Sequence, residues 1–432
     1  MMKRVLLLGT GPTSVQLAVI LKKYAHCDEV GIVGRTSVRS EGFFSALERN
    51  ENRLQAHIQN QKDESMQGEC SIDQVFCGYE TIKGTWDTLI LSVTTDAYMD
   101  VLQQIDTGII RDVTCIILIS PTFGSNFLVK SFFHRLHLNV EVISFSTYVG
   151  DTRWLTNNPS NQVLTTALKK KVFIGSTSTS SETIDRLDRL FQQLGITLEK
   201  MRAPIEAETR NISLYVHPPL FMNPFSLKAI FGESVVTKYV YKLFPEGPIT
   251  QNLIRDLRTH WQEIMNILNK IGIEEINLLK FMIDDNYPVR AESISRHDIE
   301  SFQQLNDIHQ EYLLYIRYSA LLIDPFSKPN KEGKYFDFSA VPIRQMFVNR
   351  EGELDIPRMP KEDYYRIKII QGIAKYLGLS SPTIDKFVDT YERKIKEVTK
   401  AHSQKRLSNA FVVQRFHDDV QMICEEIDQY TN

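Results

Sequence analysis

The sequence has few cysteines, and they are placed neither for a zinc site nor for a disulfide framework. The 432-residue chain has five of them, none in a CxxC pair: Cys27, Cys70, Cys77, Cys115 and Cys424. An odd and scattered set of this kind favours a reducing compartment. Of the ten histidines, only His134 and His137 are closely spaced, so we expect no protein-bound metal.

An excess of one charge and long apolar runs are also missing. The formal net charge is −3, with acidic and basic residues mixed along the chain, which argues against nucleic-acid binding. The apolar run near the N-terminus is too short for a signal peptide or a membrane span. We therefore expect a cytoplasmic protein that binds neither nucleic acid nor membranes, with two or three domains at this length.

A strand, a glycine turn and a helix follow one another at the N-terminus. Residues 5–8 are a continuous apolar run, as in a buried parallel strand, and an apolar-rich helix begins after the turn. This order is typical of a dinucleotide-binding fold, in which the turn contacts the pyrophosphate at the helix N-terminus. The residues that we expect to contact the cofactor are Gly9, Thr10, Gly11, Pro12 and Thr13.

The second predicted strand, residues 29–33, ends in a basic loop. An NAD-specific fold usually carries an acidic residue near this point, whereas this chain has Arg35, Thr36, Ser37 and Arg39. Guanidinium groups and hydroxyls suit a 2′-phosphate, which a carboxylate would repel. The loop therefore favours NADP(H) over NAD, the alternative being an exposed basic loop without a ligand.

Polar residues follow three further buried-strand patterns, at residues 87–93, 115–120 and 141–146. In an open parallel sheet, ligands bind beyond the carboxyl ends of the strands, so we expect a polar cleft there, although helix capping would explain some of these hydroxyls. Thr94 is a candidate cofactor contact, and Tyr148, Asp151 and Arg153 are candidate substrate contacts. Residues 1–200 are the predicted nucleotide-binding domain and residues 201–432 a mainly helical one.

His217 stands between apolar residues and the pair Pro218-Pro219. A proline pair disfavours a helix before it, so we expect His217 at a rigid corner. It would be either a catalytic residue or a structural histidine in the core or at a cap. Further along, a helix is predicted over about 298–323. Its core-facing stripe would be Phe302, Leu305, Ile308, Tyr312 and Tyr315.

Several unusual blocks resemble the opine metallophore dehydrogenases, among them VLLLGTGPTSVQLA, VISFSTYVGDTR, AETRNISLYVHPPLFMN, EYLLYIRYSALLIDPFS and PRMPKEDYYR. The resemblance runs from residue 5 to about 387. It implies an α/β fold, with a Rossmann-type parallel sheet domain before an all-helical domain, and a homodimer. It also implies an NADPH-dependent condensation of an aminobutyryl-histidine amine with a 2-oxo acid, through an imine.

The resemblance assigns roles to particular residues. His217 would be the acid/base group, for which the unperturbed imidazole pKa near ~6.5 is suited, and Asp324 would orient it or simply form a turn. Arg153 and Arg210 would bind substrate carboxylates or be ordinary ion-pair partners. Asp151, placed near the keto acid, would favour pyruvate over 2-oxoglutarate by repelling a second carboxylate, unless it caps a helix or binds the amine.

Two other functions fit the same residues. One is an NADP-dependent dehydrogenase of the same two-domain plan that reduces a simple 2-oxo acid to a hydroxy acid. The other is an NADP(H)-sensing protein without turnover. Oxidation of NADPH with pyruvate alone would favour the first, and cofactor binding without oxidation would favour the second.

Overall fold

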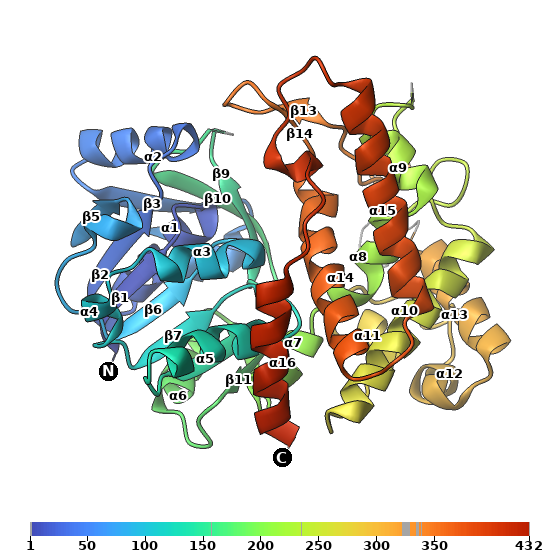
Figure 1. Cartoon of the computed structure of the whole chain (residues 1–432), viewed down its shortest axis with the longest axis horizontal. Helices are drawn as coiled ribbons and strands as arrows, with labels where there is room; N and C mark the ends of the chain where they lie inside the picture. Colours follow the sequence, from blue (N-terminus) through green and yellow to red (C-terminus); the bar gives the residue numbers. More distant parts are fainter. Residues whose placement is uncertain are drawn as a thin grey trace. The chain divides into compact units, whose positions relative to one another are not determined.

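The chain divides after Asn211 into two compact units, Met1–Asn211 and Ile212–Asn432 (Figure 1). The computed structural model describes residues 2–156, 158–234, 236–321, 329–333, 337 and 339–431. The expected boundary at residue 200 lies before helix α7 (Pro204–Thr209), which packs on strands of the first unit. No helix in the described part of the chain is both long and apolar enough to cross a membrane.

The first unit is built on a sheet of eight strands among the residues described. They are β1 (Met2–Leu8), β2 (Cys27–Gly34), β5 (Gln74–Cys77), β6 (Thr88–Leu91), β7 (Cys115–Leu118), β8 (Glu141–Phe145), β11 (Lys171–Ser176) and β12 (Thr197–Lys200). The order is β12-β11-β8-β7-β6-β1-β2-β5, parallel except where β11 meets β8. The six strands from β5 to β8 follow the Rossmann order, as the sequence predicted.

Helices cover both faces of this sheet, which is why its strands read as unbroken apolar runs. Val5 and Leu7 of β1 pack with helices α1 (Pro12–Lys23) and α6 (Glu182–Gln193). Leu6 and Leu8 face the other way, toward α3 (Tyr98–Gln103) and α5 (Ser125–Arg135). Figure 1 shows α3 and α5 together on one side of the sheet. The crossing between β1 and β6 is the point where the strand order reverses.

A second sheet in this unit was not predicted from the sequence. Its strands are β3 (Arg53–Ile58), β4 (Gly68–Ser71), β9 (Gly150–Trp154) and β10 (Gln162–Leu168), in the order β4-β3-β10-β9. We expected the polar residues after the strand pattern at 141–146 to form a loop. This prediction is partly wrong, because Asp151 and Arg153 lie on strand β9. The sequence of β9, GDTRW, is short and polar, so it does not resemble a buried strand. The pairing of β10 with β3 joins segments that are far apart in sequence. Local periodicity cannot detect such a pairing.

A buried carboxylate fastens α7 to the large sheet. Both oxygens of Glu208 accept hydrogen bonds, from the backbone N–H groups of Gly124 (2.9 Å) and Asn126 (2.7 Å), the Asn126 amide (2.9 Å) and the Ser144 hydroxyl (2.8 Å). Burial raises the pKa of the Glu208 carboxyl to about 8, and these four hydrogen bonds oppose that rise. Since Gly124 and Asn126 begin α5, the carboxylate caps that helix and fixes the loop after β7.

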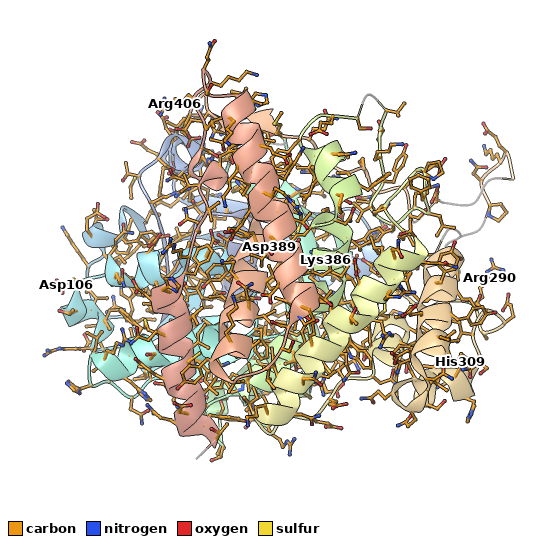
Figure 2. All side chains as sticks on the ribbon, turned by 45° about the vertical axis from the view of Figure 1, so that its right-hand side comes forward. Asp106, Arg290, His309, Lys386, Asp389 and Arg406 are labelled. Atoms are coloured by element: carbon orange, nitrogen blue, oxygen red, sulfur yellow. The ribbon has the colours of Figure 1, made fainter. Side chains whose placement is uncertain are left out.

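The second unit is mainly helical, as expected. Its helices are α8 (Ser213–Phe221), α9 (Pro224–Ile230), α10 (Gln251–Lys270), α11 (Leu278–Asp284), α12 (Arg296–Glu300), α13 (Asp307–Ala320), α14 (Arg358–Tyr376), α15 (Pro382–Ala401) and α16 (His417–Thr431), beside a small ladder of β13 (Phe347–Val348) and β14 (Leu354–Asp355). Helix α8 packs against α10 and α14. Figure 2 shows Lys386 and Asp389 on α15, where Lys386 is ion-paired to Asp256 of α10 (2.6 Å).

The long helix predicted over 298–323 is interrupted in the structure. A short 3₁₀ turn follows α12, and α13 begins anew after Asn306, whose side chain accepts a hydrogen bond from the His309 N–H. The predicted core stripe is wrong in part: Phe302 is fully buried as expected, but Ile308 is 82% exposed and Tyr312 60% exposed. The new cap changes the helical phase, so a different set is buried: Gln310, Leu313, Leu314, Arg317 and Tyr318.

Candidate functional site

The glycine turn after β1 offers a backbone site for a phosphate. Gly9 has a φ of +127°, and a Cβ there would lie 3.0 Å from Val93, whereas a Cβ on Gly11 would meet nothing within 4 Å. Gly11 is the N-cap of α1, which has no side-chain cap and no acidic residue in its first turn. Pro12 has no N–H, and the Ser14 N–H bonds to the Gly11 carbonyl (3.0 Å), so this turn offers an anion the Thr13 N–H and the positive end of the helix dipole. Thr10, Pro12 and Thr13 are only partly buried beside this turn.

Two serines connect the turn to the neighbouring strand. Ser14 Oγ lies 2.6 Å from Ser92 Oγ, which also donates to the Leu8 carbonyl (3.0 Å). Ser14 takes the place of the third glycine of the usual motif, and its hydroxyl ties α1 to Ser92, which in turn joins the end of β6 to β1. Thr94 follows β6 in an exposed position and makes no side-chain capping bond. A Cβ on Gly9 would meet Val93, the residue before Thr94, so Thr94 lies near the glycine turn, and its contact with a cofactor stays a prediction.

The loop after β2 presents basic groups at the adjacent strand end. Gly34 cannot be replaced without a clash, since a Cβ there would lie 2.5 Å from Thr10 Cγ2. Arg35, Thr36 and Arg39 are exposed, whereas Ser37 caps helix α2 (Val38–Arg49) in a reciprocal arrangement with Ser40. These residues fit a dinucleotide with a 2′-phosphate, because two guanidinium groups and a hydroxyl stand where an NAD-binding chain has a carboxylate.

The residues expected to bind substrate in the first unit fall into different surroundings. Tyr148 donates to or accepts from Thr152 (3.1 Å), and this contact continues through Thr165 to Gln16 of α1. Asp151 accepts a hydrogen bond from Thr166 (2.7 Å) and caps no helix. Asp151 and Arg153 share the exposed face of β9. Arg210 ends α7, with its guanidinium 5.9 Å from the centre of the Phe173 ring.

His217 lies within helix α8, so the predicted rigid corner is wrong. Pro218 and Pro219 are both inside this nine-residue helix. A proline at position 218 leaves the Leu214 carbonyl without its usual N–H donor, and the imidazole Nε2 of His260 in α10 occupies that role at 3.0 Å. The hydrogen bond from His260 thus replaces the backbone bond that Pro218 removes from α8. Sequence reasoning alone does not reveal this contact, because His260 belongs to another helix.

The imidazole of His217 lies beside a buried carboxylate. Its Nδ1 is 3.5 Å from Asp363 Oδ1 and 3.0 Å from Met359 Sδ, and the side chain is 20% exposed, whereas that of Asp363 is fully buried. Asp363 Oδ1 is also ion-paired with Arg366, one helical turn further along α14. The carboxylate can therefore orient the ring and stabilise its protonated form while the guanidinium compensates its charge.

Asp363 was not among the residues singled out from the sequence. It stands in the block PRMPKEDYYR, between a charged residue and two tyrosines, and nothing in that local pattern connects it to His217. The one available signal was a carboxylate on the apolar face of a helix, with an arginine three residues on. Asp324, the predicted orienter, lies outside the residues that the structure describes.

Arg317 is a buried cation in the same unit. It is 4% exposed, it has no carboxylate partner in the part of the chain that the structure describes, and its Nε makes no hydrogen bond there. Burial lowers its pKa, and its guanidinium lies 5.2 Å from the centre of the Tyr318 ring. Burial raises the pKa of the nearby Tyr241 phenol well above its usual range, and the positive charge of Arg317 opposes that rise. Such an arrangement can transfer protons at an imidazole and bind an anion at a guanidinium.

In the described ranges no three side chains of histidine, cysteine, aspartate or glutamate gather so as to hold a metal ion.

Comparison with known proteins places the whole chain in one family. The sequence pattern of the family described as staphylopine dehydrogenase matches residues 3–427. The chain is 47% identical to the staphylopine synthase of Staphylococcus aureus, with 98% of each protein covered. It is 33% identical to the pseudopaline synthase of Pseudomonas aeruginosa, over 90% of this chain and 89% of that protein.

Solved structures give the same picture. Yersinopine dehydrogenase with bound NADP⁺ matches over 99% of both chains, with a TM-score of 0.90 and 28% identity. Octopine dehydrogenase with NADH and pyruvate matches 91% of this chain and 89% of its own, with a TM-score of 0.61. At 17% identity, that second likeness shows the fold alone.

We predict that replacing Asp363 by asparagine lowers kcat by on the order of 10²-fold, because the imidazole loses the anion that stabilises its protonated form. Steady-state kinetics would measure this, together with the melting temperature, since Arg366 also loses its partner. Glu362→Gln is the matched control, a neighbouring carboxylate that pairs with Arg358 instead. An Asp363→Asn variant with normal turnover would contradict the assigned pair.

Proposed function

Because the chain belongs to the staphylopine dehydrogenase family, we propose that it completes an opine metallophore by joining an amine to a 2-oxo acid and reducing the imine that forms. The observation that carries the proposal is the His217 imidazole beside the buried Asp363 carboxylate, in a chain whose first unit fits a dinucleotide. The amine we propose is that of a histidine bearing an aminobutyrate unit, as the resemblance implies. The product would be a staphylopine-like compound.

NADPH is the proposed reductant, and it supplies a hydride to the imine carbon when bound. The N-terminus of α1 and the turn from Gly9 to Thr13 would hold its pyrophosphate. Arg35, Arg39 and the Thr36 hydroxyl would hold the 2′-phosphate, and the bound NADP⁺ of the related yersinopine dehydrogenase supports this choice.

His217 would handle the protons of the condensation. The neutral imidazole accepts a proton as the amine attacks the keto carbon, and the resulting imidazolium is stabilised by Asp363. The imidazolium returns that proton to the alkoxide oxygen, which gives the carbinolamine. The same transfer through His217 then carries the remaining N–H proton to the hydroxyl group, which leaves as water while the C=N bond forms. His217 is neutral again after each transfer. Bound NADPH would supply the hydride for the imine carbon, and the imine nitrogen would take one proton from solvent through His217.

We expect His217→Ala to cut turnover by on the order of 10²-fold or more while NADPH binding, measured by fluorescence titration, stays intact. The assay should follow the product by mass spectrometry, with NADPH, the aminobutyryl-histidine precursor and either pyruvate or 2-oxoglutarate. His297→Ala, an exposed histidine of the same unit, is the control.

The same experiment discriminates the alternatives. NADPH oxidation with pyruvate in the absence of the amine would favour the simple 2-oxo acid dehydrogenase. Binding of NADPH without oxidation by any combination, in wild type and His217→Ala alike, would favour the sensing protein.

Arg317 would bind a carboxylate of one of the two acid substrates. A buried guanidinium without a carboxylate partner in the described part of the chain carries a desolvation cost that an anionic ligand can offset. Arg153 and Arg210 of the first unit are further candidates for the carboxylates.

Arg317→Met keeps most of the side-chain volume and removes the charge. We expect it to raise KM for one acid substrate by about 10-fold or more, the loss of one charge-assisted contact, with a smaller change for the other. Arg296→Met, an exposed and ion-paired arginine, is the control for stability and activity. Unchanged KM values for both acids in a folded variant would remove Arg317 from the site.

Asp151 would make pyruvate the preferred 2-oxo acid. Its carboxylate lies on the exposed face of β9 and is held by Thr166, so it presents a fixed negative charge. Pyruvate ends in a methyl group, whereas 2-oxoglutarate ends in a second carboxylate, which would be repelled by about 1 to 4 kcal/mol at ~4 Å.

Asp151→Ala should therefore reduce the ratio of kcat/KM for pyruvate to that for 2-oxoglutarate by about 5-fold or more. Asp112→Ala is a suitable control, since Asp112 is exposed and lies just before β7 of the eight-stranded sheet, whereas Asp151 lies on the second sheet. If the ratio is the same in wild type and Asp151→Ala, the charge does not select the acid.

A further inference from the structure

The helix that carries His217 contains a defect at a defined atom. In a regular helix the N–H of residue 218 would donate to the carbonyl of Leu214, but Pro218 has no N–H. Leu214 is 1% exposed, so water does not readily replace the missing donor. A buried carbonyl without a donor is costly and would leave the turn from Leu214 to His217 poorly held.

His260 supplies the missing donor from α10. Its Nε2 lies 3.0 Å from the Leu214 carbonyl oxygen, and the residue is fully buried. A carbonyl can only accept, so Nε2 must carry the hydrogen and Nδ1 the lone pair. Nδ1 is buried without a hydrogen-bond partner among the described residues. The tautomer is therefore set by the contact to α8.

The surroundings keep His260 neutral. Burial lowers its pKa to about 4, and the hydrogen bond to Leu214 opposes this. The ring packs edge-on against Phe387 of α15. The charge of Arg366 also lowers the pKa of His260, and that of Asp363 opposes this. Arg366 and Asp363 are the two groups paired next to His217.

We propose that His260 is a positioning residue for His217. As a neutral histidine, it supplies the hydrogen-bond donor that Pro218 lacks and so holds the turn of α8 in which His217 lies beside Asp363. This inference rests on the proposed role of His217. It assigns to α10 a part in the reaction without direct contact with substrate.

Substitutions that keep or remove the donor test this role. His260→Phe preserves the ring and the packing but cannot donate, and we expect kcat to fall by about 10-fold or more. His260→Gln places an amide N–H near the position of Nε2, and we expect kcat within about 3-fold of wild type. Equal losses in the two variants, at similar melting temperatures, would overturn the proposal.

The decisive measurement is rescue from the other side of the hydrogen bond. Pro218→Ala restores the backbone N–H, so the Leu214 carbonyl no longer needs His260. We expect His260→Phe to cost at least 10-fold in kcat with Pro218 present and less than about 3-fold when Pro218→Ala is also present. The same loss in both backgrounds would show that His260 acts in some other way, and would contradict the proposal.

Two further readouts separate this inference from the proposed function. In a His217→Ala background, His260→Phe should lower the residual kcat no further, and a full additional loss would contradict action through His217. Nitrogen NMR of histidine-labelled protein should show His260 protonated at Nε2 and not titrating between pH 6 and 8. The opposite tautomer would overturn the inference. Normal turnover of His217→Ala with the expected His260 tautomer would instead count against the proposed function alone.

Discussion

The Asp363 carboxylate lies without solvent contact between the Arg366 guanidinium and the His217 imidazole. A buried carboxylate is stable only when its charge is compensated, and removing either partner would leave a charge that the interior cannot solvate. Helices α8 and α14 are joined at this carboxylate, and α10 meets α8 at the neighbouring carbonyl of Leu214. Helices α8, α10 and α14 thus meet around the segment that carries the His217 imidazole.

Two buried carboxylates, those of Glu208 and Asp363, connect helices to other elements. Glu208 fastens α7 to the start of α5 with four hydrogen bonds, and both of its oxygens have partners. Arg317 differs, since its guanidinium lies in the interior with no carboxylate partner in the described part of the chain. The fold accounts for Glu208, whereas the Arg317 guanidinium donates to the Met282 carbonyl (3.5 Å) and its Nε has no partner among the described residues.

The glycine-turn region of the first unit was predictable because its parts depend on their sequence neighbours. The apolar strand, the turn at Gly9 and Gly11, the helix that follows and the basic loop at Arg35 lie within about 40 consecutive residues, and each has its own local signal. The strand order then brings Thr94 to the same sheet edge. The second sheet escaped prediction because β3 and β10 pair with each other although they lie far apart in sequence. The alternation of polar and apolar residues in β3 (RLQAHI) does not by itself identify its partner strand.

The sequence by itself determined that a Rossmann-type half precedes a helical half, that a glycine turn follows the first strand and that a basic loop follows the second. It also singled out His217 as the candidate acid/base residue. The tertiary structure decided that His217 lies in a helix despite two prolines, that Asp363 stands beside it, and that Ile308 and Tyr312 of α13 are exposed. The physical reason is the same in each case. Local propensity depends on the hydrogen bonds and apolar contacts that neighbours in sequence can make. The Leu214 carbonyl is instead bonded by His260 of another helix, and Asp363 lies beside His217 of another helix. In α13, the cap at Asn306 decides which face is buried.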